Sequence, residues 1–239
     1  AKTAIAHLGG REDHAVAVFN RTSAAIVASI LALSEGQPVV SFIPQGDRSH
    51  ASVVRGCALA RVELIEIGED EPSEEILARN TPALVIITTV TSSLSRLPDD
   101  KTRGAIAAAK RVGAAVLLDE AYGARLRPVL HGGAKSLQLG ADMAVTNADK
   151  AGLSGPRAGI MVGECTNVLA VQAKASELGQ DARAPIAAGA MRSLQRFDPE
   201  HLRTEARDGS TIAHALSARF GPEIVHPSDL GPAIGEEDI

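Results

Sequence analysis

The chain has 239 residues, a formal net charge of −5 and interspersed acidic and basic residues, so it lacks the basic patch typical of a nucleic-acid-binding protein. Hydrophobic residues make up 45% of the sequence but aromatic residues only 2%, so a sizeable core has to be built from Ala, Val, Ile and Leu. No apolar run reaches the roughly 18 to 20 residues that span a bilayer, no signal peptide is visible, and Cys57 and Cys165 stand outside any metal-ligand spacing. We therefore expect a cytoplasmic protein with reduced cysteines, no membrane partner and no metal.

Short apolar segments alternate with helical patterns along the first 163 residues. Several of these segments are apolar at every position, which is typical of strands covered on both faces in a mainly parallel sheet. Strands are predicted at 15–19, 38–43, 62–67, 83–89, 114–119, 142–146 and 158–163. Helices are predicted between them at 23–34, 49–60, 72–79 and 100–112. The alternation predicts an α/β fold with a doubly wound, mainly parallel, seven-stranded sheet.

From about residue 164 the pattern becomes helical. Helices are predicted at 165–178, 184–196 and 199–219. Asp198 and Pro199 fit the N-cap and first position of the last of these helices. The remaining residues, 221–239, are rich in Pro, Gly and acidic residues and are predicted to form either a loop or the truncated edge of a further part. We expect one large domain at 1–197, followed at 198–239 by a helical connection and the start of an incomplete C-terminal part.

Polar residues follow several predicted strands at the point where each strand ends. Asn20–Ser23 follows the first strand, a loop leading to His50 follows the second, Asp119 ends the fifth, and Lys150 comes shortly after the sixth. In open α/β sheets, ligands bind outside the carboxyl ends of the strands. A group of polar side chains on an apolar scaffold is typical of a cofactor site.

Lys150 is one of only six lysines, against eighteen arginines. A lysine in a surface loop is the ordinary interpretation, but a desolvated lysine is a nucleophile that can form a Schiff base with pyridoxal phosphate. Asp119, 31 residues upstream, ends an otherwise apolar strand, and a buried carboxylate needs a partner. The protonated ring nitrogen of pyridoxal phosphate is one such partner. A helix cap or a salt bridge is the alternative for Asp119.

Two helix starts have more than one interpretation. Thr22 and Ser23 open an apolar helix, where they fit an N-cap, a phosphate site formed by free N–H groups and hydroxyls, or both. His50 opens the next helix, where its ring could stack on an aromatic cofactor, act as an acid or base, or simply face solvent near a cap.

The sequence does not match several other known functional motifs. The sequence has no GxGxxG, and GGAKS (132–136) lacks the upstream glycine of a P-loop. GLSGP (152–156) is not the GxSxG of a nucleophile elbow, and no HExxH occurs. Five histidines without a comparable setting are expected to be surface or structural residues: His7, His14, His201, His214 and His226.

Six segments together resemble a known family. They are FNRTSAAI (19–26), GDRSHASVVRGC (46–57), LLDEAYGARLRPVL (117–130), LGADMAVTNADK (139–150), GPRAGIMVG (155–163) and DARAPIAAGAMRSLQRF (181–197). The chain resembles the fold-type I pyridoxal-phosphate enzymes, and most closely the archaeal selenocysteine-synthase-like group, relatives of bacterial L-seryl-tRNA(Sec) selenium transferase. The resemblance implies an aspartate-aminotransferase-like large domain in which the last strand of the sheet runs antiparallel, and a small C-terminal domain that is absent or incomplete here.

The resemblance also implies roles for residues around the cofactor ring. Lys150 carries pyridoxal phosphate as a Schiff base and is the catalytic residue. Asp119 pairs with the ring nitrogen, Ala121 lies against one face of the ring, and His50 stacks on the other face.

A second set of implied roles concerns the cofactor phosphate. Arg21, Thr22 and Ser23 hold it through backbone amides and hydroxyls. Asn147 stands where relatives often have a phosphate-binding serine, and Arg157 reaches the phosphate or the substrate.

The function implied is that of a pyridoxal-phosphate-dependent transferase or lyase acting on the β-carbon of a serine- or cysteine-like amino acid. Relatives of this kind are homodimers or larger homo-oligomers with a small-molecule substrate. A tRNA substrate is not expected, because the chain has a charge of −5. The alternatives are a homologue that binds the cofactor without turnover and, more remotely, an ordinary nucleotide-binding α/β protein.

Overall fold

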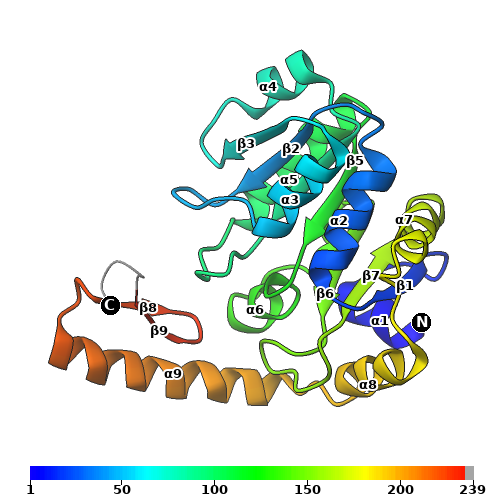
Figure 1. The fold of residues 1–239 in the computed structure, drawn as a ribbon. Coiled ribbons are helices and arrows are strands. Elements are labelled where there is room, and N and C mark those ends of the chain that lie inside the picture. Colours follow the sequence, from blue (N-terminus) through cyan, green and yellow to red (C-terminus); the bar gives the residue numbers. More distant parts are fainter. Residues whose placement is uncertain (235–239) are drawn as a thin grey trace.

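The computed structural model describes residues 1–234, so the last five residues of the expected C-terminal part lie outside it. A seven-stranded sheet forms the centre of the molecule (Figure 1). Its strands are β1 (Ala15–Phe19), β2 (Val39–Ile43), β3 (Leu64–Gly68), β4 (Leu84–Thr88), β5 (Ala115–Asp119), β6 (Met143–Asn147) and β7 (Gly159–Gly163). The helices are α1 (Lys2–Leu8), α2 (Thr22–Leu33), α3 (Ala51–Ala60), α4 (Ser73–Asn80), α5 (Asp99–Arg111), α6 (Gly123–Leu130), the short η1 (Ser136–Leu139), α7 (Cys165–Glu177), α8 (Ala184–Gln195) and α9 (Pro199–Phe220).

The strand order is β1-β7-β6-β5-β4-β2-β3. Strands β2 to β6 pair in parallel, whereas β7 is antiparallel to both of its neighbours, β6 and β1. The predicted α/β class, the mainly parallel seven-stranded sheet and the antiparallel last strand are therefore confirmed. Each predicted strand lies within two residues of its observed bounds.

Helices cover both faces of the sheet. Side chains of α2, α3 and α7 pack on one face, and side chains of α1, α4, α5, α6 and α8 pack on the other. Within β4, Leu84 and Ile86 contribute to the first of these cores, and Val85 and Ile87 contribute to the second. Because successive side chains of a strand point to opposite faces, a strand buried on both faces has to be apolar throughout.

The prediction of a loop over 221–239 is wrong for its described part. Strands β8 (Val225–Ser228) and β9 (Gly231–Ile234) pair there as an antiparallel hairpin. Pro227 lies opposite Pro232 in this hairpin, and a proline inside an apolar run argues against a strand because it cannot donate to the ladder. The hairpin packs on α9 where Gly209 has no side chain, since a Cβ there would collide with the backbone of Leu230.

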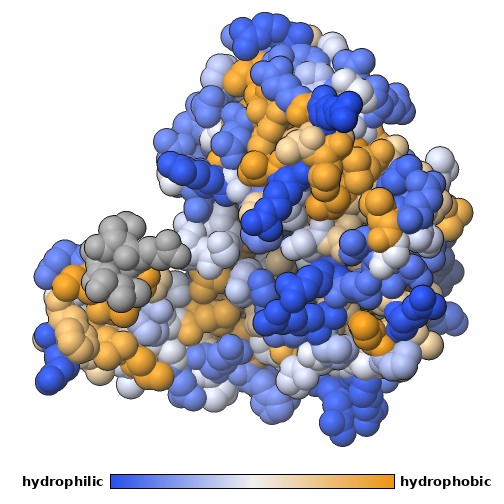
Figure 2. Space-filling view, in the orientation of Figure 1, coloured by the Kyte–Doolittle hydropathy of each residue, from blue (hydrophilic) through white to orange (hydrophobic). Residues whose placement is uncertain are grey.

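Helix α9 begins as the sequence predicts and carries the hairpin away from the sheet (Figure 1). Asp198 is the N-cap, and its side chain accepts a hydrogen bond from the Glu200 N–H at 2.9 Å. Exposed apolar side chains lie near the end of this helix and on the hairpin, where Figure 2 shows an orange patch; they are Ile212, Phe220 and Ile234. Within residues 1–234, no helix combines the length and apolar character needed to cross a membrane.

A buried polar network ties α6 to the carboxyl ends of β4 and β5. Arg127 donates to Glu120 at 2.5 Å and to Asp99 at 2.8 Å, and Thr89 donates to Glu120 at 2.9 Å. A side chain at Gly123 would collide with Thr89 and Glu120, so glycine is required where α6 begins. The network fixes the start of α6 against the edge of the sheet that carries Asp119.

We expect Glu120→Ala to lower the free energy of unfolding by about 3 to 5 kcal/mol, because it leaves the buried Arg127 guanidinium with one carboxylate fewer. Urea unfolding measures this change. The control is Asp13→Ala, which breaks an exposed ion pair with Arg11 and should lower the free energy of unfolding far less. Equal losses in the two variants would contradict a stabilising role for the buried network.

Candidate functional site

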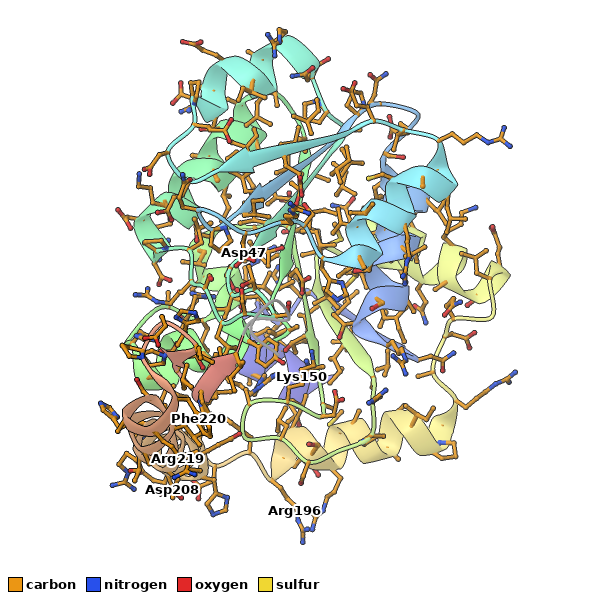
Figure 3. All side chains as sticks on the ribbon, turned by 60° about the vertical axis from the view of Figure 1, so that its left-hand side comes forward. Asp47, Lys150, Arg196, Asp208, Arg219 and Phe220 are labelled. Carbon is orange, nitrogen blue, oxygen red and sulfur yellow. The ribbon has the colours of Figure 1, made fainter. Side chains whose placement is uncertain are left out.

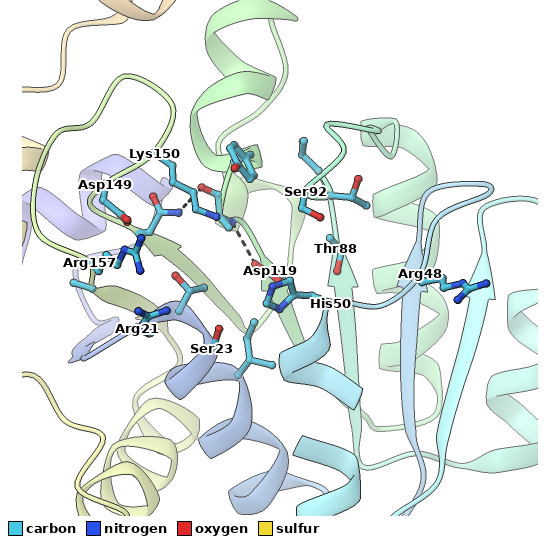
Figure 4. Close-up of a pocket in the computed structure, with 18 residues that line it drawn as sticks. Arg21, Ser23, Arg48, His50, Thr88, Ser92, Asp119, Asp149, Lys150 and Arg157 are labelled. Carbon is cyan, nitrogen blue, oxygen red and sulfur yellow. Dashed lines mark hydrogen bonds between the residues drawn. The ribbon is translucent and has the colours of Figure 1, made fainter. Parts of the chain in front are cut away.

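A cavity of about 330 Å³ opens at the carboxyl ends of β4, β5 and β6, beside the start of α2 (Figure 4). All nine site residues predicted from the sequence line it: Arg21, Thr22, Ser23, His50, Asp119, Ala121, Asn147, Lys150 and Arg157. The cavity is also lined by residues that the sequence analysis did not select: Ile26, Arg48, Thr88, Val90, Thr91, Ser92, Tyr122, Asp149 and Ala158. Residues far apart in the sequence therefore meet at the edge of the sheet where ligands bind in this class of fold.

Lys150 stands in a tight loop directly after β6. The N–H of Gly155 donates to the carbonyl of Ala148 at 2.8 Å, and the N–H of Leu153 donates to the carbonyl of Lys150 at 3.3 Å. Gly155 has no room for a side chain, because a Cβ would lie 2.7 Å from the Ala148 carbonyl oxygen. These contacts close the loop on itself and leave the Lys150 side chain exposed toward the cavity.

The Lys150 amine lies over an aromatic ring. Its Nζ is 4.5 Å from the centroid of the Tyr122 ring, within the range of a cation–π interaction. Tyr122 is the only tyrosine of the chain and follows Asp119 by three residues, which was the one available sequence signal for its role. The ring restricts where the amine can lie when it is protonated.

Asp119 forms the floor of the cavity at the end of β5. Its side chain is buried, and its one hydrogen bond within residues 1–234 comes from the N–H of Ala121 at 3.3 Å. No Lys, Arg or His nitrogen of these residues lies within 4.0 Å of its carboxylate. Burial raises the pKa of Asp119 to about 6; the Ala121 hydrogen bond opposes this shift, and the nearby Glu120 adds to it. The salt bridge weighed as an alternative for Asp119 is therefore not formed within the described chain.

The start of α2 has backbone N–H groups that find no hydrogen-bond acceptor within residues 1–234. Arg21 occupies the N-cap without a side-chain cap bond, so the expected cap by the Thr22 or Ser23 hydroxyl is not formed. The N–H groups of Thr22 and Ser23 have no acceptor within residues 1–234. A Cβ at Gly159 would lie 2.6 Å from the Arg21 carbonyl oxygen, so glycine allows β7 to pass close to this turn. Free N–H groups and the helix dipole make the turn a binding place for an anion.

Two arginines stand on the same side of the cavity as this helix start (Figure 4). Arg21 and Arg157 are both exposed, and neither guanidinium takes part in an ion pair within the described residues. Their charges add to the positive potential at the start of α2. The start of α2 and these two arginines therefore form an anion-binding place on one side of Asp119.

His50 caps its own helix. Its Nδ1 accepts from the Ser52 N–H at 3.2 Å and lies 2.6 Å from Ser52 Oγ. Desolvation and the nearby charges of Lys150 and Arg55 lower the pKa of His50, so the imidazole is neutral at pH 7. The prediction that His50 lies at the cap of its helix is thus confirmed. The same ring also lines the cavity.

Asn147 lines the cavity, but its polar atoms have partners inside the protein. Its Oδ1 accepts from Arg125 at 2.7 Å, and its Nδ2 donates to the carbonyl of Ala121 at 2.9 Å. One hydrogen of its amide nitrogen remains for a ligand. The geometry gives Asn147 a role in joining the ends of β5 and β6.

A carboxylate joins two loops that contribute residues to the cavity. Asp47 accepts hydrogen bonds from the hydroxyls of Thr91 and Ser93, both at 2.7 Å. These bonds lower the pKa of Asp47 although its partial burial acts in the opposite direction. The hydroxyl-rich segment after β4 is visible in the sequence, but its partner lies in another loop. Figure 3 places Asp47 and Lys150 in the central part of the molecule, away from Arg196, which follows α8, and from Asp208, Arg219 and Phe220 of α9.

No protein-family model matches the chain. Among curated proteins, it is 37% identical over 201 residues to a UPF0425 pyridoxal phosphate-dependent protein of Methanothermobacter thermautotrophicus, covering 82% of this chain and 50% of that protein. It is 32% identical over 211 residues to a UPF0425 pyridoxal phosphate-dependent protein of Methanopyrus kandleri, covering 88% of this chain and 58% of that protein. The chain thus spans about half the length of the curated relatives it matches.

Solved structures show the same fold. Cystathionine gamma synthase from Xanthomonas oryzae pv. oryzae matches with a TM-score of 0.69 and 24% identity over 93% of this chain and 55% of that one. Aspartate aminotransferase from Thermotoga maritima matches with a TM-score of 0.69 and 16% identity over 91% of this chain and 60% of that one. The chain is therefore a relative of the UPF0425 pyridoxal phosphate-dependent proteins, and its α/β fold is that of the fold-type I pyridoxal-phosphate enzymes.

Proposed function

We propose that this chain binds pyridoxal phosphate through Lys150 and that it forms part of a pyridoxal-phosphate-dependent transferase or lyase. The observation that carries the proposal is the meeting of Lys150, Asp119 and the free N–H groups of α2 around one cavity. The pyridoxal-phosphate dependence stated in the relatives' names supports it. The fold that the chain shares with cystathionine gamma synthase is a further support.

The residues present fit this cofactor. A buried carboxylate without a cationic partner in the described chain, Asp119, suits the protonated nitrogen of a pyridine ring. The N–H groups of Thr22 and Ser23, with Arg21 and Arg157 beside them, suit a phosphate. The exposed Lys150 amine in the same cavity suits the aldehyde group.

When bound, pyridoxal phosphate supplies an electron sink for the charge that develops on an amino-acid substrate. Each protein group then has a task set by its position. Ionised Asp119 would hold a proton on the ring nitrogen, and the Thr22 and Ser23 amides would hold the phosphate. The neutral ring of His50 would line the cofactor site and help to exclude water. Once a substrate amine has displaced Lys150 from the cofactor, the freed Lys150 amine would take and return the proton at the substrate α-carbon.

The finer part of the proposal concerns the substrate. We place the reaction at the β-carbon of a serine- or cysteine-like amino acid, as in the selenocysteine-synthase-like enzymes that the sequence resembles. The support is the motif series around Asp119 and Lys150 described above. We further propose a small-molecule substrate, not a tRNA, and a homodimer or larger homo-oligomer.

Incubation with pyridoxal phosphate followed by borohydride reduction should attach one cofactor covalently, and peptide mass analysis should locate it at Lys150. Lys150→Ala should lose both the label and the visible absorbance of the bound cofactor. Lys174→Ala is the control, because this lysine lies on α7 in an exposed ion pair with Glu177. A label spread over several lysines, or one that survives in Lys150→Ala, would refute the assignment.

The raised pKa of Asp119 makes stability depend on pH in the protein freed of bound small molecules. Because the folded state keeps this carboxyl protonated up to about pH 6, against an ordinary value of 3.8, the free energy of unfolding should fall as pH rises from 4 to 6. The fall relative to Asp119→Asn should be on the order of 3 kcal/mol, measured by urea unfolding across this range.

Added pyridoxal phosphate should reverse this difference at pH 7, because its ring nitrogen then pairs with the ionised carboxylate. It should therefore raise the melting temperature of the wild-type protein more than that of Asp119→Asn. Asp208→Asn, on the exposed side of α9, serves as the matched control for both measurements. If ATP or NAD stabilises the protein and pyridoxal phosphate does not, the proposed cofactor is wrong.

Turnover is tested by exchange of the α-proton of L-serine and L-cysteine in deuterated water, read by mass spectrometry of the amino acid. The wild-type protein loaded with cofactor should exchange the proton, and Lys150→Ala should lose at least about two orders of magnitude in rate, as expected for removal of a general base. Cofactor bound at Lys150 without any exchange would instead identify a homologue that binds the cofactor without turnover.

A further inference from the structure

Two arginines of α6, two residues apart, are both fully buried but have different surroundings. Arg127 is in ion pairs with Glu120 and Asp99. Arg125 has no carboxylate oxygen within 4.0 Å among residues 1–234. Burying a cation without a carboxylate is costly unless hydrogen bonds compensate it. The fold therefore keeps Arg125 in place through other contacts.

Those contacts are oxygen atoms from three segments that meet beside the cavity. The guanidinium donates to the Ala151 carbonyl at 3.1 Å, the Thr146 hydroxyl at 2.9 Å, the Ala121 carbonyl at 2.8 Å and the Asn147 Oδ1 at 2.7 Å. Ala151 immediately follows Lys150, Thr146 and Asn147 end β6, and Ala121 follows Asp119 by two residues. One side chain thus joins the segments that carry Asp119 and Lys150.

A residue of α1, His7, lies beside the Arg125 guanidinium. Nε2 of His7 lies 3.5 Å from Arg125 Nη1, and the His7 ring packs edge-on against Phe197. Burial and then the charge of Arg125 lower the pKa of His7 to about 3, so the ring is neutral at physiological pH and can only accept from the guanidinium. The guanidinium therefore has a polar but uncharged contact on this side.

We propose that Arg125 is a positioning residue of the site, which holds the Lys150 loop and the ends of β5 and β6 in the geometry that cofactor binding requires. This inference rests on the proposed function. Arginine is the side chain suited to this role, because it alone presents five donors in one rigid plane. A neutral side chain of similar length has too few donors for four acceptors on three segments.

The inference predicts a local effect that is independent of any cofactor. Arg125→Met should speed hydrogen exchange of the Leu153 and Gly155 amides, whose hydrogen bonds close the Lys150 loop. Arg127→Met is the matched control, since that arginine is equally buried on the same helix but has no hydrogen bond to the loop. It should lower global stability and leave the exchange of these two amides, relative to the rest of the core, unchanged.

A second measurement concerns the bound cofactor. Arg125→Met should weaken pyridoxal phosphate binding on the order of tenfold or more and reduce the circular dichroism of its visible absorbance, because the attachment point is no longer fixed. Arg125→Lys and Arg125→Gln, which retain some of the donors, should recover part of both signals. Arg127→Met should retain the dichroism at any temperature at which it is folded.

The outcomes separate this inference from the proposed function. Faster hydrogen exchange of the Leu153 and Gly155 amides in Arg125→Met alone supports the positioning role even if no pyridoxal phosphate binds to the wild-type protein. Equal changes in Arg125→Met and Arg127→Met, or unchanged exchange and dichroism in a folded Arg125→Met, would overturn it. If Arg125→Met does not fold, the comparison of Arg125→Gln with Arg127→Gln gives the same decision.

Discussion

The parallel pairing of β5 with β6 is the constraint on which the site depends. Leu117, Leu118 and Asp119 pair in register with Met143, Ala144 and Val145, so both strands end at the same edge of the sheet. Asp119 ends one strand, and the loop carrying Lys150 leaves the other. A shift of the pairing by one residue would turn the Asp119 side chain to the other face of the sheet. The strand register thereby sets the spacing between two polar groups.

The charged groups of the cavity occupy separate places. In Figure 4, Asp119 lies between the start of α2 with Arg21 and Arg157 on one side and Arg48 on the other. Lys150 stands beside them on its own loop. Such an arrangement matches a ligand with a cationic ring nitrogen at one end and a phosphate at the other, and it disfavours the reverse orientation. Electrostatic preorganisation of this kind costs no rearrangement at the moment of binding.

Helix α6 connects this edge of the sheet to the rest of the molecule through its two buried arginines. Arg127 secures the start of the helix through carboxylates, and Arg125 joins the segments beside the cavity through carbonyl, hydroxyl and amide oxygens. Each guanidinium nitrogen of Arg125 has a hydrogen-bond acceptor, whereas the buried Nε of Arg127 has none within residues 1–234. Buried polar groups that all have partners rigidify a structure, so Arg125 makes the segments beside Lys150 rigid.

The sequence by itself determined the sheet and the main charged residues of the site. Strands buried on both faces have to be apolar throughout. This pattern predicted the bounds of β1 to β7 to within two residues. The positions of Asp119, Lys150 and the start of α2 at strand ends then predicted that they belong to the site. Helix α6 was not predicted, because it is short and contains Pro128. The β8–β9 hairpin was missed because prolines lie in both strands.

Only the tertiary structure decided which side chains support the site. Arg125 and Arg127 stand two residues apart and are chemically identical, so no local pattern distinguishes the one that contacts the Lys150 loop from the one in ion pairs. The contact of Asp47 with Thr91 and that of His7 with Arg125 join residues 44 and 118 positions apart. Such contacts depend on how whole elements pack, since periodicity and spacing report only on neighbours along the chain.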